Sequence, residues 1–172
     1  MKKALYIFGL ILIASCTTQK TSFDYDRNQD FSQIRDYRIQ IQQNSMSELS
    51  MNRIEAAILE ELSAKSMTFN ESSENLIQIT TEEFVSETAG SNIGISTGSY
   101  GGSFGTSIGV GIPITSKKLN QRYLVSIFNS ANQLIWEGKL DVQTSENVSS
   151  EVLESSVRKG IQKLFKDYPP KK

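Results

Sequence analysis

Two stretches of the chain repeat their apolar residues every three or four positions, which places those side chains on one stripe of an α-helix. The first stripe comprises Met51, Ile54, Ala57, Ile58 and Leu62, and the second comprises Leu153, Val157, Ile161, Leu164, Phe165 and Tyr168. Ser45 fits a capping box with Glu48, although Ser47 or Ser50 could also begin the first helix. The second begins near Ser149 or Ser150 and stops before Pro169-Pro170. We therefore predict two amphipathic helices.

Other stretches alternate apolar and polar residues, as half-buried strands do. They are residues 23–26, 37–42, 76–81 with a continuation through Val85, 123–128 and 134–140. The last two runs are joined by the short polar turn 129–132, which favours an antiparallel hairpin. On its second arm we expect one core face, formed by Leu134, Trp136, Leu140 and Val142.

The order of these elements predicts an α+β fold with a mixed or mostly antiparallel sheet and two helices packed on one face. That arrangement is the simplest way to bury two helical stripes and one face of the sheet. We assign residues 23–172 to a single domain, which is long enough to bury a substantial core.

A glycine-rich insert, residues 89–115, interrupts the domain and holds most of the eleven glycines. Such a segment buries little apolar area per residue and loses much backbone entropy on ordering, so we expect a long loop. A hairpin is the alternative, because Ile108, Val110, Ile112 and Ile114 alternate with small residues and could pair with an arm that carries Ile93 and Ile95.

The first sixteen residues have the pattern of a bacterial lipoprotein signal. Lys2 and Lys3 precede about 12 apolar or small residues, too few for the ~20 of a membrane-spanning helix. Ile13-Ala14-Ser15-Cys16 resembles the lipobox, in which the cysteine receives a diacylglyceryl group. We predict a signal peptide over residues 1–15, lipidation of Cys16, and a disordered polar tether over residues 16–22.

Composition and charge narrow the functional classes. The chain has one cysteine, so no disulfide forms within it, and it has no histidine. Loss of Lys2 and Lys3 leaves 16 of 18 basic residues against 19 acidic ones, a net charge of about −3. Such a surface gives no electrostatic reason to bind nucleic acid. Attachment to the membrane would come from the acyl chains on Cys16.

Sequence patterns that suggest catalysis are weak here. Gly-x-Ser-x-Gly occurs three times, around Ser96, Ser103 and Ser107, but repeated hits are expected in a Gly/Ser-rich segment. A serine triad also needs a histidine. Ser156 and Lys159 match Ser-x-x-Lys without its companion motifs, and the stripe of the last helix explains Ser156 better. A phosphate-binding loop is missing. We expect no catalytic residues, no cofactor and no enzyme activity.

Metal binding is not expected either. Without histidine, and with Cys16 assigned to lipid, only carboxylates are available. Asp24, Asp26 and Asp30 lack the glycine and distal glutamate of an EF-hand loop. The neighbouring Glu82 and Glu83 would point to opposite faces of a strand, so they do not form a paired acid and base.

Several short motifs resemble the bacterial lipoproteins grouped as domain of unknown function 4136. They are Phe23-Asp24-Tyr25-Asp26, Asp30-Phe31-Ser32, Tyr37, Arg53-Ile54, Ala57-Ile58, Leu62 with Lys65, Leu134-Ile135-Trp136-Glu137-Gly138, and Tyr168-Pro169-Pro170. The sequence departs at Ile39 or Ile41, where the family often has tryptophan, and at Ser66, where it often has glycine. The resemblance implies an envelope lipoprotein without an assigned activity, and it supplies no functional residues.

We therefore expect a lipid-anchored envelope protein whose domain binds or scaffolds an envelope protein partner, with the glycine-rich segment as its adaptable surface. Thr17 is not the aspartate that favours retention in the inner membrane of proteobacteria, which favours the outer membrane, facing the periplasm. The alternative is β-assembly or membrane insertion through a glycine-rich hairpin over residues 93–114.

Overall fold

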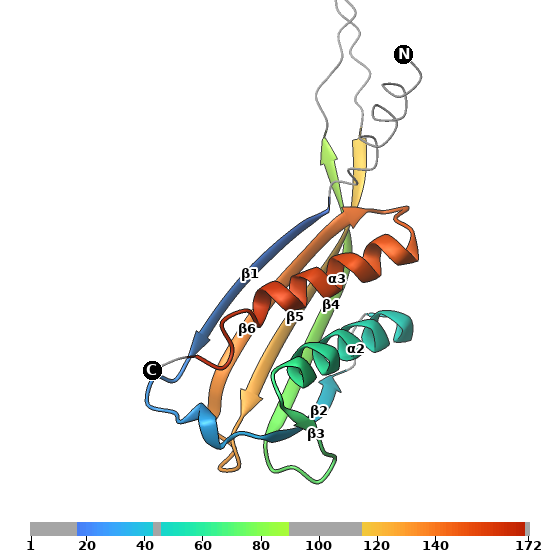
Figure 1. Ribbon diagram of the computed structural model, residues 1–172. Coiled ribbons are helices and arrows are strands. Elements are labelled where there is room, and N and C mark those ends of the chain that lie inside the picture. Colours follow the sequence, from blue (N-terminus) through green and yellow to red (C-terminus); the bar gives the residue numbers. More distant parts are fainter. Residues whose placement is uncertain (1–16, 43–45, 90–114, 171–172) are drawn as a thin grey trace, which may run out of the picture.

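A computed structural model describes residues 17–42, 46–89 and 115–170. Within these ranges the chain forms six strands, two α-helices and one short 3-10 helix (Figure 1). In chain order they are β1 (Thr18–Tyr25), η2 (Phe31–Gln33), β2 (Asp36–Gln42), α2 (Glu48–Ala64), β3 (Thr68–Phe69), β4 (Leu76–Ala89), β5 (Thr115–Phe128), β6 (Leu134–Ser145) and α3 (Ser150–Leu164).

The strands form one open sheet in the order β1-β6-β5-β4-β2-β3. β1, β6, β5 and β4 are antiparallel neighbours, whereas β2 runs parallel to both β4 and β3. A parallel connection requires a crossover, and α2 supplies it between β2 and β4. Both helices lie on the same side of the sheet (Figure 1). The predicted α+β class, the mixed sheet and the placement of both helices are confirmed.

Both helices begin at a serine cap. The side chain of Ser47 accepts a hydrogen bond from the backbone N–H of Ser50, and Ser149 accepts one from Val152. These bonds satisfy backbone donors that the first turn leaves unpaired. Of the three candidate caps for the first helix, Ser47 is the one used. Glu61 and Lys65, one turn apart on the first of these helices, form an ion pair with 3.6 Å between Oε1 and Nζ.

The core between helices and sheet is organised around Trp136, which is 1% exposed. Its ring stacks on Phe165 with centroids 5.0 Å apart and meets Tyr168 edge-on at 5.5 Å. Two glycines allow this close packing. A Cβ on Gly138 would lie 2.2 Å from the Trp136 ring, and one on Gly160 would lie 2.7 Å from Leu140. The last helix thus approaches the sheet closely at Gly160.

The predicted tether is wrong for most of its length. β1 begins at Thr18, and Thr18 through Ser22 pair with Gln143 through Lys139 of β6. The polar composition of residues 17–22 did not indicate a strand, because β1 is an edge strand whose inward side chains are only half-buried. An edge strand therefore starts two residues after Cys16.

The alternation along β6 also differs from the expectation at one point. Leu134 was predicted to share the core face of Trp136, but it is 48% exposed, whereas Ile135 is 2% exposed. The pairing of β5 with β6 shifts by one residue between Ile127 and Phe128, which marks a bulge. A bulge interrupts the two-residue period, and here it turns Ile135 inward in place of Leu134.

β4 and β5 are longer than predicted and stay paired out to Ala89 and Thr115. The expected glycine-rich loop or hairpin between them lies outside the described residues. In the described part of the chain, no helix combines the length and apolar character needed to span a bilayer.

Candidate functional site

The face of the sheet opposite the helices is uncovered in the described ranges, and its side chains are mostly polar. Because side chains alternate along a strand, every second residue of each strand belongs to this face. The central part of the face contains Glu82 and Phe84 from β4, Asn120 and Arg122 from β5, and Asp141 and Gln143 from β6. No local sequence motif contains these residues together. The register of the three strands brings them into one place.

Arg122 connects three strands on this face. Its Nε lies 3.0 Å from Asp141 Oδ1, and its other end, Nη1, lies 2.7 Å from Glu82 Oε2. The guanidinium carbon also lies 5.7 Å from the centre of the Phe84 ring, within range of a cation–π contact. The hydrogen bonds to Asp141 and then to Glu82 raise the pKa of Arg122 above its usual value. The positive charge is thus held in one place by two carboxylates.

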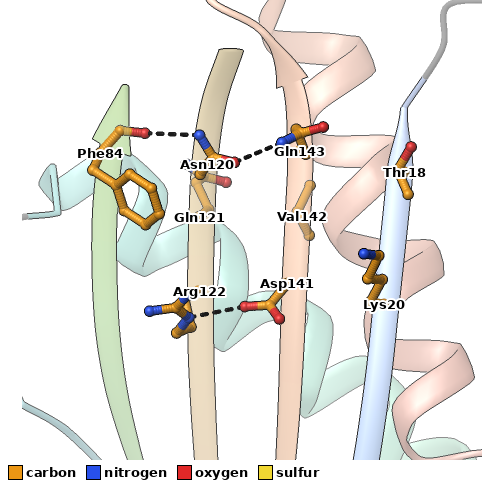
Figure 2. A pocket seen from close by; sticks show the side chains of 9 residues that line it. All are labelled: Thr18, Lys20, Phe84, Asn120, Gln121, Arg122, Asp141, Val142 and Gln143. Atoms are coloured by element: carbon orange, nitrogen blue, oxygen red, sulfur yellow. Dashed lines mark hydrogen bonds and ion pairs between the residues drawn. The ribbon is translucent and has the colours of Figure 1, made fainter. Parts of the chain in front are cut away.

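Asn120 lies one row further along the sheet and extends these contacts into what we call the polar array. Its amide nitrogen donates to Ser86 Oγ at 2.8 Å, and its amide oxygen accepts from Gln143 Nε2 at 2.8 Å. Beside it the surface has a shallow depression of about 200 Å³, which also reaches Thr18 and Lys20 of β1 (Figure 2). Four strands therefore contribute to one polar surface near the start of β1.

The array is suited to binding rather than to holding the fold together. Water and salt screen exposed ion pairs, so such pairs contribute little to stability. Here the Arg122 and Asp141 side chains are 43% and 39% exposed, and the second oxygen of Asp141, Oδ2, lies 3.8 Å from Lys139 Nζ. Their mutual contacts fix the positions of donors and acceptors before a partner arrives, which lowers the entropy lost on association.

A second polar cluster lies on the helix side of the same strands and was not predicted. Gln121 is 1% exposed and donates to Glu83 and, at 3.3 Å, to Ser50 Oγ at the start of α2. Tyr123 donates its hydroxyl to Gln121 at 2.8 Å, and burial raises its pKa. These bonds satisfy buried polar groups and position α2 on the sheet. Gln121 also belongs to the lining of the depression beside Asn120 (Figure 2).

The candidate residues from the sequence do not assemble into a catalytic centre. Ser156 is buried and donates to the Val152 carbonyl at 2.7 Å, while Lys159 is exposed. Glu82 and Glu83 contact different partners on opposite faces of β4, as predicted. Cys16 and the serines at 96, 103 and 107 lie outside the described residues.

The three candidate aspartates serve local structure. Asp26 accepts from the backbone of Asn28, and Asp30 caps the 3-10 helix through Ser32, whereas Asp24 lies on β1. Across the ranges with described side chains, no three acidic or sulfur ligands lie close enough to hold a metal ion.

Solved structures resemble this chain at low sequence identity. A PDZ domain protein from Parabacteroides distasonis superposes with a TM-score of 0.51 and 16% identity, over 99% of this chain. The chain spans 40% of the length of that protein. A PelC dodecamer from Paraburkholderia phytofirmans has a TM-score of 0.49 at 8% identity, with 86% of this chain and 97% of that one covered. A minor lipoprotein from Acinetobacter baumannii has a TM-score of 0.45 at 8% identity, covering 78% and 91%.

No curated protein matches the sequence. A family model, in contrast, matches nearly the whole described domain, from the middle of β1 to the prolines after α3. Because the family described as domain of unknown function (DUF4136) matches residues 21–170, the chain belongs to that family.

Proposed function

We propose that this protein is a cell-envelope lipoprotein, held to a membrane by lipid on Cys16, that binds an envelope protein partner through the uncovered face of its sheet. The observation that carries the proposal is the position of the polar array centred on Arg122, close to the strand that starts two residues after Cys16. Binding, and not catalysis, is the activity that this surface supports.

The anchoring half of the proposal rests on the signal pattern and on the start of β1. Thr18 lies two positions after Cys16, and a fully extended chain covers at most about 3.6 Å per residue. The first strand therefore starts within about 7 Å of the modified cysteine. An anchor this short holds the domain on the membrane surface instead of letting it range through the compartment.

Lipidation is tested with the full-length protein and a Cys16→Ser variant. We expect the native protein to fractionate with membranes, and mass spectrometry to find a mature N-terminus at Cys16 carrying acyl chains. The variant should be released or should keep its signal peptide. Density-gradient separation of the two membranes then tests the outer-membrane location for which Thr17 argues. An unmodified sulfur, or a mature chain that begins elsewhere, contradicts the anchor.

Partner binding is tested by photo-crosslinking in intact cells. A photoreactive residue at Gln143 samples the uncovered face, and one at Lys159 samples the exposed side of α3 as a matched control. We expect a discrete crosslinked band from position 143 only, and its loss when Arg122→Ala is added. Equal capture from both positions, or no band at position 143, contradicts the binding face.

The rival function, β-assembly or membrane insertion through residues 93–114, concerns a segment outside the described residues. The register does show that its flanks, Ala89 and Thr115, are paired neighbours. Deletion of residues 90–111 separates the two ideas. Our proposal expects the shortened protein to stay folded, monomeric and active in crosslinking, whereas the rival expects its function to be lost.

A further inference from the structure

The start of β1 and one end of the paired strands β4 and β5 lie on the same side of the domain. The register places Thr18 of β1 beside Gln143, Gln143 beside Asn120, and Asn120 beside Phe84. These four residues thus form one row across the sheet. β4 and β5 continue beyond this row to Ala89 and Thr115, past the start of β1 and the first turn of α3 (Figure 1).

The lengths on either side of the row can be compared directly. Ala89 lies five residues beyond Phe84, and a strand rises about 3.3 Å per residue. The paired ends of β4 and β5, which we call the ribbon, therefore extend about 17 Å past the row. Cys16 lies two residues beyond Thr18 and can reach only about 7 Å in the same direction. The end of the ribbon therefore projects about 10 Å farther than the residue that would carry the lipid.

That excess is comparable with the polar headgroup layer, which is roughly 5–7 Å thick in each leaflet. With Cys16 at the interface, an upright domain would place the ribbon among the headgroups. A tilted domain would lay the ribbon along the membrane surface. In both of these orientations the ribbon touches the bilayer.

The side chains at the base of the ribbon suit a membrane interface. Phe84 and Val85 are adjacent, belong to opposite faces and are 40% and 49% exposed, so each face presents an apolar side chain. Lys118 and Lys117 of β5 lie across from the next two residues of β4, Ser86 and Glu87. The Lys117 side chain is 52% exposed, with its Nζ 4.0 Å from Glu87 Oε1. Aromatic rings and lysines are the residues that favour the boundary between headgroups and acyl chains.

We propose that the β4–β5 ribbon, residues 84–89 and 115–119, is a membrane-contacting surface that rests on the bilayer holding the lipidated Cys16. This inference rests on the proposed lipidation. It assigns the orientation of the domain, with the β5–β6 turn around Ser130 pointing away from the membrane.

The test uses the mature lipidated protein in vesicles of phosphatidylethanolamine and phosphatidylglycerol. Because Cys16 is the only cysteine and its sulfur is alkylated by lipid, a Glu87→Cys substitution supplies a single free thiol for an environment-sensitive fluorophore. Ser130→Cys is the matched control at the opposite end of β5. Lipids with a nitroxide near the headgroup quench only fluorophores that approach the bilayer. We expect quenching at position 87 to exceed that at position 130 by several fold.

A linker variant tests the comparison of lengths. Ten Gly/Ser residues inserted between Cys16 and Thr17 add an average span of about 17–19 Å, which exceeds the ribbon's excess reach. We expect the variant to float with vesicles while quenching at position 87 falls toward the value at position 130. Equal quenching at both positions in protein that floats, or quenching unchanged by the linker, overturns the inference. Protein that does not float with vesicles refutes the lipid anchor itself.

Discussion

Replacement of Gly138 by alanine tests how tightly the core around the single tryptophan is packed. The added Cβ would lie 2.2 Å from Cη2 and 2.7 Å from Cζ3 of Trp136, and 2.9 Å from Leu164 Cδ1. These separations are far below van der Waals contact, so the indole has to move. Phe165 and Tyr168 hold it on two sides, with ring centroids 5.0 and 5.5 Å away, so it cannot move alone.

The expected cost follows from this geometry. Insertion of a methyl group into a well-packed core costs typically ~1–3 kcal/mol, and a rigid, buried indole places this site at the upper end. Alanine in place of a glycine inside a strand also stabilises the protein by about 0.5–1 kcal/mol, because alanine loses less backbone entropy on folding. We therefore expect Gly138→Ala to lower the free energy of unfolding by about 2 kcal/mol. For a domain of this size the melting temperature would fall by roughly 4–8 °C.

Urea denaturation followed by the fluorescence of Trp136 measures the effect, because this residue is the only tryptophan. Near-ultraviolet circular dichroism of the same variant should change, since the indole's surroundings are altered. Gly160→Ala is the control. Its Cβ would meet the flexible end of Leu140, and the helix gains about 1 kcal/mol from alanine, so the net change should be small. The packing argument fails if Gly138→Ala costs less than the control or leaves the circular dichroism unchanged.

Three further outcomes are expected. Asn70 and then Ser73 donate hydrogen bonds to Asp36 and lower its pKa, so its contribution to stability is present above the unfolded pKa of ~3.9 and is lost as the pH falls through the lower folded value. The urea midpoint should therefore drop more between pH 5 and pH 2 in the native protein than in Asp36→Asn. Ser149→Ala removes the cap of α3 and should cost about 1 kcal/mol in chemical denaturation. Arg122→Ala should leave the melting temperature nearly unchanged while weakening crosslinking from the uncovered face.

The sequence predicted the elements that bury a continuous apolar stripe. Both helices and the β5–β6 turn follow from periodic burial, because one face of each element packs against the core. The ends of β4 and β5 escaped prediction, since segments such as Lys117-Lys118 are held by backbone pairing with their neighbours and carry no apolar alternation. The bulge at Ile135 was invisible because a one-residue shift in pairing leaves no local signal.

The candidate site could not be anticipated for a different reason. Glu82, Arg122 and Asp141 are ordinary surface residues when each is considered in its own stretch of sequence. Their meeting depends on the register of three strands, and register is set by the buried face on the other side of the sheet. The prediction that Glu82 and Glu83 diverge succeeded because it required only the two-residue period within one strand.

The pairing of β1 with β6 sets an order of events during synthesis. β1 is an edge strand, so residues 18–25 have no partner strand until β6 has emerged. The stretch next to Cys16 consequently stays unpaired while most of the polypeptide is still being made. If the cysteine is modified as proposed, the modifying enzymes meet a pliable segment, and docking of that segment completes the sheet only after the anchor is in place.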